Sequence, residues 1–205
     1  MNGASPSLRR STSVFINCPF DGGFTRQRNA LVLACVLSGF YPVMADSGPG
    51  GRPRLERILS GLMGSRYSIH DLSRCRGEGD ANLARFNMPL ELGMAMALRA
   101  APAAHEAAHE YLILVPDDRG AYRRFVSDLA GFDPPGYDGT PARIALEGLA
   151  WLQTATEAPA ALAPRDLLPK LSLFDAAMER LAADWQGGTI PWDYVVAAAA
   201  DVASQ

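Results

Sequence analysis

The strongest constraint on the fold is a continuous apolar run at residues 111–116 (YLILVP). A strand with one solvated face alternates apolar and polar residues, whereas a strand of a parallel sheet is buried on both faces and is apolar throughout. The run therefore predicts a central strand of a parallel sheet that is covered by helices on both sides.

Two further strand patterns end abruptly in polar residues. Residues 13–16 (SVFI) lead into Asn17, and residues 67–69 (YSI) lead into His70 and Asp71. Strands whose carboxyl ends are polar are typical of α/β domains, which bind ligands beyond those ends.

Helical patterns separate the strand patterns. They cover residues 24–37, which stop before Gly39, and residues 54–63, and a weak strand pattern at residues 41–45 lies between them. Alternation of strand and helix favours right-handed crossovers with helices on both sheet faces. We therefore predict an α/β fold, a flavodoxin-like three-layer sandwich with a parallel sheet, plus C-terminal helices.

The C-terminal part is predicted to be helical. Residues 122–129 have a short helical pattern, residues 131–140 are dense in turn formers, and helices follow at about 141–154, 166–185 and 191–203. We divide the chain into a disordered tail at residues 1–12, a flavodoxin-like domain at 13–155 and a helical extension packed on it at 156–205.

Charge and composition exclude some classes of protein. The 205 residues have a formal charge of −3, which argues against sequence-specific nucleic acid as the partner. The helix at residues 24–37 carries two arginines and is too short to cross a membrane. The first 13 residues have no apolar signal segment, and the three cysteines are odd in number. We expect a cytoplasmic protein with reduced thiols and no membrane contact.

The stretch at residues 85–97 (RFNMPLELGMAMA) carries the main candidate for a catalytic group, Glu91. Proline is favoured at the start of a helix, so Pro89 predicts a helix that begins there and holds Glu91 in its first turn. The residues after Glu91 are mostly apolar. An acid in a first turn also complements the helix dipole without having any other role, and the sequence leaves these two interpretations open.

In a flavodoxin-like strand order the ligand crevice lies between the first and third strands. Both of these strands end in polar residues, and Glu91 opens the helix after the third. We therefore predict a site that includes Glu91 and Asp71 and holds no metal. The predicted substrate-binding residues share this crevice, and they are Asn17, Pro19, Phe20, Asp21, His70, Ser73, Arg85, Asn87 and Met88.

Two residues near the site, Cys18 and His70, have alternative interpretations. Cys18 is either a nucleophile or, as we favour, a small residue of the wall, because a nucleophilic cysteine needs a histidine base. His70 either orients a substrate hydroxyl or phosphate or is satisfied by a backbone carbonyl. Asp71 is well placed to hold ribose hydroxyls, as acids do in dinucleotide-binding folds.

Residues 105–109 (HEAAH) match the zinc-peptidase pattern H-E-x-x-H. The peptidase pattern lies within a long helix, whereas this one lies directly before the strand at residues 111–115. We therefore interpret His105 and His109 as parts of an exposed connection without a metal.

Three motifs together resemble a family of small bacterial proteins that are similar to nucleoside 2-deoxyribosyltransferases and TIR domains. The motifs are residues 14–21 (VFINCPFD), 66–74 (RYSIHDLSR) and 85–93 (RFNMPLELG). The resemblance implies that Glu91, followed by Gly93, is the nucleophile that attacks the anomeric carbon, and that Asp71 is the acid near the third strand. Asn17 departs from the Tyr or Asp that the transferases often have near their first strand. Asn87, Met88 and Pro89 replace the Ser and Cys residues of TIR domains.

The expected function is that of an N-glycosidase or (deoxy)ribosyltransferase-like hydrolase that cleaves the N-ribosyl bond of a nucleotide or NAD. Such a reaction passes through an oxocarbenium-like transition state that a carboxylate stabilises. NAD or the nucleotide is the substrate, so no cofactor is expected. The alternatives are a TIR-like nucleotide-sensing or protein-interaction module and a structural subunit. The expected partners are a small-molecule nucleotide and either a second copy of the chain or a partner protein of an antiphage defence system.

Overall fold

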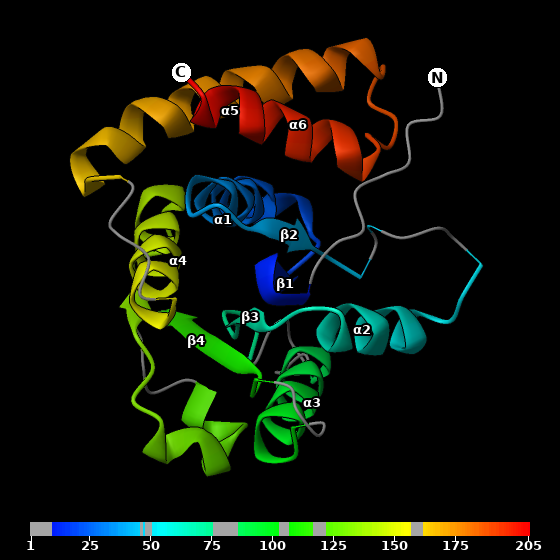
Figure 1. Ribbon diagram of the computed structural model, residues 1–205, viewed down its shortest axis with the longest axis vertical. Coiled ribbons are helices and arrows are strands. Elements are labelled where there is room, and N and C mark those ends of the chain that lie inside the picture. The colour runs from blue at the N-terminus through cyan, green and yellow to red at the C-terminus, as the bar shows by residue number, and fades with distance from the viewer. Residues whose placement is uncertain are drawn as a thin grey trace.

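The protein has a five-stranded parallel sheet with the strand order β2-β1-β3-β4-β5 (Figure 1). The computed structural model describes residues 10–45, 47, 51–75, 86–102, 107–116, 122–156 and 162–205. The strands are β1 (Ser13–Asn17), β2 (Tyr41–Val43), β3 (Tyr67–Asp71), β4 (Glu110–Pro116) and β5 (Gly136–Tyr137). This order reverses direction between β1 and β3, as in the flavodoxin-like fold.

Helices cover both faces of the sheet, which makes a three-layer α/β sandwich (Figure 1). The helices are α1 (Thr25–Leu37), α2 (Arg54–Met63), α3 (Asn87–Ala100), α4 (Pro141–Ala155), α5 (Pro164–Asp184) and α6 (Trp192–Ala203), and the short 3-10 helices are η1 (Arg10–Thr12), η2 (Gly22–Phe24), η3 (Tyr122–Arg124) and η4 (Ser127–Gly131). The predicted fold class is therefore confirmed. No helix in the described ranges is long and apolar enough to span a bilayer.

Side-chain alternation along the strands assigns each residue to one face of the sheet. Val14 and Ile16 of β1 belong to the core cluster that α1 and α4 complete. Phe15 belongs to the cluster that includes Ile58 and Leu62 of α2. Because successive strand residues point to opposite faces, Asn17 lies on the same side as Phe15, facing α2 and α3.

Two glycines explain local features of the packing. A β-carbon built at Gly61 would lie 2.7 Å from the Phe15 ring, so a side chain there would push α2 away from the sheet. Gly39 has a φ of 79° and ends α1. The amide of Gly39 donates to Val36 O and that of Phe40 donates to Cys35 O, which is the Schellman arrangement that terminates helices.

The C-terminal helices α5 and α6 lie across α1, on the side of α1 that faces away from β1 (Figure 1). As a result α1 is covered both by the sheet and by these helices, and every residue from Asn29 to Cys35 is buried. A helix with only one covered face would show polar residues at regular spacing along the exposed face.

Three sequence-based expectations are wrong in detail. The strand β5 lies within residues 131–140, which the turn formers predicted to be a loop. Residues 122–129 form two 3-10 helices where one short helix was predicted. The helix α3 begins at Asn87, so Pro89 is its third residue and Glu91 lies in its second turn. Pro89 is tolerated because the amides of a first turn have no intrahelical acceptor.

Candidate functional site

The ends of β1 and β3 are joined by one side chain, Asn17. The register pairs Asn17 with His70, and the Asn17 amide nitrogen donates to His70 Nδ1 at 3.0 Å. The same nitrogen donates to the backbone oxygen of Met88 in α3 at 3.1 Å. Asn17 therefore connects β1, β3 and α3 at the carboxyl edge of the sheet.

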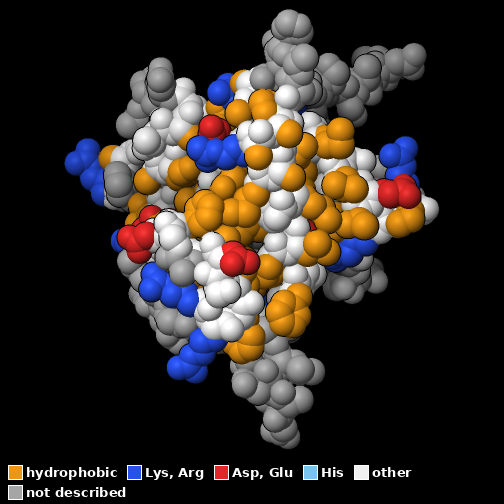
Figure 2. All heavy atoms as spheres, turned by 90° about the horizontal axis from the view of Figure 1, so that it is seen from below, with side chains coloured by type: hydrophobic (Ala, Val, Ile, Leu, Met, Phe, Trp, Pro, Cys, Tyr) orange, Lys and Arg blue, Asp and Glu red, His pale blue; other side chains and the backbone are white. Residues whose placement is uncertain are grey.

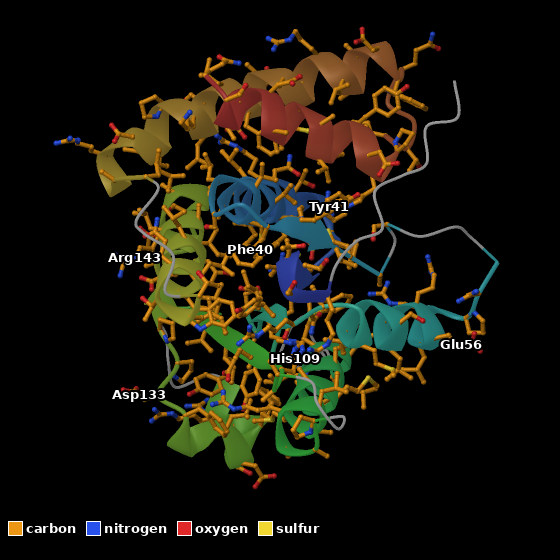
Figure 3. All side chains as sticks on the ribbon, viewed as in Figure 1. Phe40, Tyr41, Glu56, His109, Asp133 and Arg143 are labelled. Carbon is orange, nitrogen blue, oxygen red and sulfur yellow. The ribbon has the colours of Figure 1, made fainter. Side chains whose placement is uncertain are left out.

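His70 begins a buried chain of hydrogen bonds. Its Nε2 lies 2.8 Å from Ser68 Oγ, which lies 2.7 Å from His109 Nε2, and His109 Nδ1 lies 3.0 Å from Ser65 O. Ser68, His70 and His109 have no exposed surface. Figure 3 shows His109 in the middle of the molecule, close to the sheet.

The two ends of this chain fix the tautomers of both histidines. Met88 O can only accept, so the Asn17 nitrogen is a donor, His70 Nδ1 accepts, and His70 Nε2–H donates to Ser68. Ser65 O can also only accept, so His109 Nδ1–H donates and His109 Nε2 accepts from the Ser68 hydroxyl. The two assignments agree at Ser68, so every hydrogen bond of the chain is satisfied with both imidazoles neutral.

The electrostatic setting favours the same neutral forms. Burial, with a smaller effect of His109, lowers the pKa of His70 from 6.5 to about 3. Burial lowers the pKa of His109 from 6.5 to about 4, although its bond to Ser65 O opposes this. The interpretation of His109 as exposed is wrong, because an imidazole with two matched partners is stable inside the protein. His105 lies outside the described residues.

Glu91 is buried on the same side of the sheet as Asn17. Its side chain is 4% exposed, and Oε1 lies 3.8 Å from Nη2 of Arg54, whose side chain is 44% exposed. The Arg54 guanidinium also lies 5.0 Å from the centre of the Phe20 ring. Arg54 therefore stands between a buried carboxylate and the aromatic residue that follows β1.

Asp71 faces the other side of the sheet. Tyr67 and Ile69, which alternate with it, belong to the core cluster of α1 and α4. Asp71 Oδ2 accepts from Tyr137 Oη at 2.7 Å, and Oδ1 accepts from the amide and the hydroxyl of Ser73. Burial raises the pKa of Asp71 from 3.8 to about 6, although these hydrogen bonds lower it.

The other predicted site residues are distributed around the same edge. Asp21 accepts from Arg74 at 2.8 Å, Phe20 is half-buried, Pro19 and Met88 are buried, and Asn87 is exposed. Arg85 lies outside the described residues. In the described part of the structure the site thus divides into a group around Glu91 and a group around Asp71.

Cys18 is a buried thiol that belongs to the core cluster of α1 and α4. Burial, with smaller effects of Asp71 and Glu91, raises its pKa far above the usual range. A nucleophilic cysteine requires the opposite shift, so the environment of Cys18 favours its interpretation as a wall residue.

Two pockets open near this edge. One, of about 470 Å³, is lined by Arg74 and by Ser73 and Tyr137, the hydrogen-bond partners of Asp71, among others. The other, of about 540 Å³, lies between α1 and the α5–α6 pair and includes Phe20. Neither is lined by Glu91, which lies 3.8 Å from the partly exposed Arg54. Among the described residues there is no group of three or more potential metal ligands.

Comparison with protein-family models, with curated proteins and with solved structures gave no match. The description of the site therefore depends on its own geometry.

Four residues of the site were not predicted from the sequence, namely Arg54, Ser68, His109 and Tyr137. Arg54 begins the predicted helix at residues 54–63, where no local pattern marks it as a site residue, and Tyr137 lies in the unrecognised strand β5. Ser68 and His70 alternate in the sequence, which is the pattern of two side chains on one face of a strand. That spacing was the one available signal for a buried row of polar side chains. His109, which completes the row, lies 39 residues after His70 in the sequence, and no local pattern reveals a contact over that separation.

Proposed function

We propose that the protein is an N-glycosidase or (deoxy)ribosyltransferase-like enzyme that cleaves the N-ribosyl bond of a nucleotide or NAD, with Glu91 as the nucleophile. One observation carries the proposal. A nearly buried carboxylate, Glu91, is held beside the Arg54 guanidinium at the β1–β3 switch point, where folds of this strand order bind ligands.

The chemistry of the reaction fits a single carboxylate. As the N-ribosyl bond breaks, positive charge develops on the sugar, and an ionised carboxylate stabilises or captures it. The Arg54 guanidinium lies 3.8 Å from the Glu91 carboxylate. Asn17 adds an acceptor, because its Oδ1 is buried and receives no hydrogen bond from the described residues. A ribose hydroxyl is a suitable donor to that oxygen.

The contacts of Arg54 also suggest how a substrate reaches Glu91. An anionic substrate group competes with Glu91 for the guanidinium, because arginine binds phosphate as well as carboxylate. Arg54 is partly exposed and has a flexible side chain, so it moves toward such a group at little cost. Binding of the phosphate would then uncover the carboxylate at the sugar.

The leaving group that fits this site best departs without protonation. His70 is neutral and its N–H is committed to Ser68, and both oxygens of Asp71 accept hydrogen bonds on the other side of the sheet. Neither is placed to protonate a neutral purine or pyrimidine. The nicotinamide of NAD already carries a positive charge, so NAD is the favoured substrate. Substrate binding by Asp71 stays a prediction.

The test is incubation with NAD, nucleosides and nucleoside monophosphates, followed by chromatography of the free base. We expect release of nicotinamide that Glu91→Gln abolishes. Glu56→Gln, an exposed acid of α2, is the matched control and should keep wild-type activity. Release of base at equal rates by the wild type and by Glu91→Gln would contradict the proposal.

The surface of α2 and α3 favours the second candidate, a TIR-like interaction module. Figure 2 views the molecule from below the orientation of Figure 1 and shows hydrophobic side chains gathered over this face. Exposed large hydrophobic residues of this region include Leu55, Leu59 and Met63 of α2 and Phe86 and Leu90 at the start of α3. Exposed apolar patches of this kind mark contacts with other molecules. If no substrate is cleaved but NAD still raises the melting temperature, this candidate replaces the enzyme.

A further inference from the structure

The groove between α1 and the α5–α6 pair is not lined by Glu91, Asn17 or Arg54. Its volume of about 540 Å³ falls within the usual range for small-molecule sites. Its apolar wall includes Phe20, Met44, Met178, Ile190 and Trp192, and the amide of Asn29 lies among them. Aromatic rings and thioethers contact the faces of planar ring systems favourably, and an amide can bind the polar edge of such a ring.

Two arginines line the groove, Arg26 and Arg28, and so do the acids Asp175 and Glu179. The Arg28 guanidinium lies 5.8 Å from the centre of the Phe20 ring. Within the described part of the chain Arg28 forms no ion pair. Arg26, whose side chain is mostly exposed, differs from Arg28 because it forms an ion pair with Asp175. Arg28 is therefore available to an anion.

Phe20 connects the groove with Glu91. Arg28 and Arg54 both lie against the Phe20 ring, and Arg54 also contacts Glu91. Two guanidinium groups on one ring provide charge for two neighbouring phosphates. These contacts link Arg28, the Phe20 ring, Arg54 and Glu91 in turn.

We infer that the groove holds the base of a nucleoside diphosphate group whose two phosphates bind Arg28 and Arg54. The inference rests on the proposed function in one respect, which is that this group belongs to the nucleotide whose N-ribosyl bond lies at Glu91. The same chemistry is present in free ADP and in the ADP part of NAD, and the experiments below distinguish these two sources.

The first experiment measures binding of ADP to the full-length protein by calorimetry and by the fluorescence of Trp192. ADP should quench this fluorescence, and the quenching should disappear in Trp192→Phe. Arg28→Ala should weaken ADP binding about 10- to 100-fold, the usual effect of removing a hydrogen bond to a charged group. Arg180→Ala, an exposed arginine of α5 outside the groove, should leave it unchanged. Equal binding by both arginine variants would overturn the inference.

The second experiment blocks the groove. Ala182 lines the groove and Ala183, its neighbour in α5, does not, and both are exposed. Ala182→Phe should weaken ADP binding at least tenfold, whereas Ala183→Phe should not. Equal effects of the two changes, or binding of octanoate in preference to ADP, would show that the groove does not take a base.

The third experiment separates the inference from the proposed function. Glu91→Gln should bind ADP at least as tightly as the wild type, because the change removes the carboxylate that competes with the phosphate for Arg54, and ADP should displace NAD from this variant without any turnover. If ADP displaces NAD but the wild type releases no base, the result would support nucleotide binding in the groove and contradict the proposed reaction. Base release from NAD that ADP does not inhibit would support the reaction and overturn the placement of the substrate in the groove.

Discussion

The amide nitrogen of Asn17 donates at 3.0 Å to Nδ1 of His70, so a hydrogen bond between side chains continues the β1–β3 pairing beyond the backbone. Because that nitrogen also donates to Met88 O, the amide cannot rotate without losing both bonds. The carbonyl oxygen of Asn17 is therefore held in one direction. Among the hydrogen bonds of the described residues, the Asn17 amide connects the buried histidines to the site, which makes them positioning groups in the proposed enzyme.

Glu91→Gln should lower base release by more than the roughly 10²–10⁴-fold that general acid–base catalysis provides, because the nucleophile itself loses its charge. The fold should be retained, since glutamine keeps the shape of the side chain. Steady-state kinetics and circular dichroism of the two proteins give the measurement. A loss of activity that accompanies unfolding would not identify a nucleophile, so the melting temperatures must be compared first.

Ser68→Ala should destabilise the protein by about 1–3 kcal/mol for each histidine that loses its partner, because both imidazoles stay buried. Urea denaturation measures this loss. Ser172→Ala in α5 is the control, since that hydroxyl is exposed and bonds only within its helix. An equally small change in both variants would show that water replaces the Ser68 hydroxyl.

The two histidines should make stability depend on pH. Their pKa values of about 3 and about 4 in the folded state lie below 6.5, so between these values the unfolded chain binds the additional protons. The free energy of unfolding should therefore fall as the pH falls from 6.5 to 4, by about 1.4 kcal/mol per pH unit for each histidine.

Asp71 should oppose part of this dependence. The pKa of Asp71 is about 6 in the folded state and 3.8 in the unfolded chain, so between these values the folded protein binds the additional proton. That contribution increases stability as the pH falls, and offsets about one histidine. The net loss should be about 1.4 kcal/mol per pH unit. Denaturation of His109→Gln from pH 4 to 6.5 should remove most of this slope, and an unchanged slope would contradict the assignment.

Asp71→Asn distinguishes a structural from a substrate-binding role. If Asp71 holds the sugar, as its position in the sequence predicts, KM should rise and kcat should fall together. If it serves mainly to anchor Tyr137 and Ser73, stability should fall with little change in KM. Tyr137→Phe is the matched variant, because it removes one hydrogen bond to Asp71 and leaves the carboxylate in place.

Purified protein should contain no stoichiometric zinc, and His109→Gln should not change the metal content. His109 has both nitrogens bound to Ser65 and Ser68 and has none left for a metal. Elemental analysis by mass spectrometry measures this. One zinc per chain that is lost in His109→Gln would show that the H-E-x-x-H match is functional.

The sequence predicts the fold well where one residue pattern extends over a whole element. The run at residues 111–116 indicates a buried parallel strand, and β4 is that strand. The strand β5 could not be predicted, because it has two residues among turn formers and depends on pairing with Val115 and Pro116. Its assignment requires the neighbouring strand, which a local pattern does not contain.

The site is less predictable than the fold for a related reason. Asn17, His70 and Met88 were selected because they follow strands or open a helix, and the structure brings them into direct contact. Asp71 was placed with Glu91 because Asp71 ends the third strand pattern and Glu91 opens the helix that follows it. Its strand position instead turns it toward α1 and Tyr137, which alternation along β3 would have indicated.

The burial of α1 has a consequence for synthesis of the chain. The apolar surface from Asn29 to Cys35 is covered by α4, α5 and α6, which leave the ribosome long after α1. At about 5–20 residues per second, α1 stays without its cover for on the order of ten seconds. The pairing of β1 with β2 and β3 needs only the first 71 residues and can precede this. The nascent chain thus has an early sheet with an unprotected apolar helix, a surface to which cellular chaperones bind.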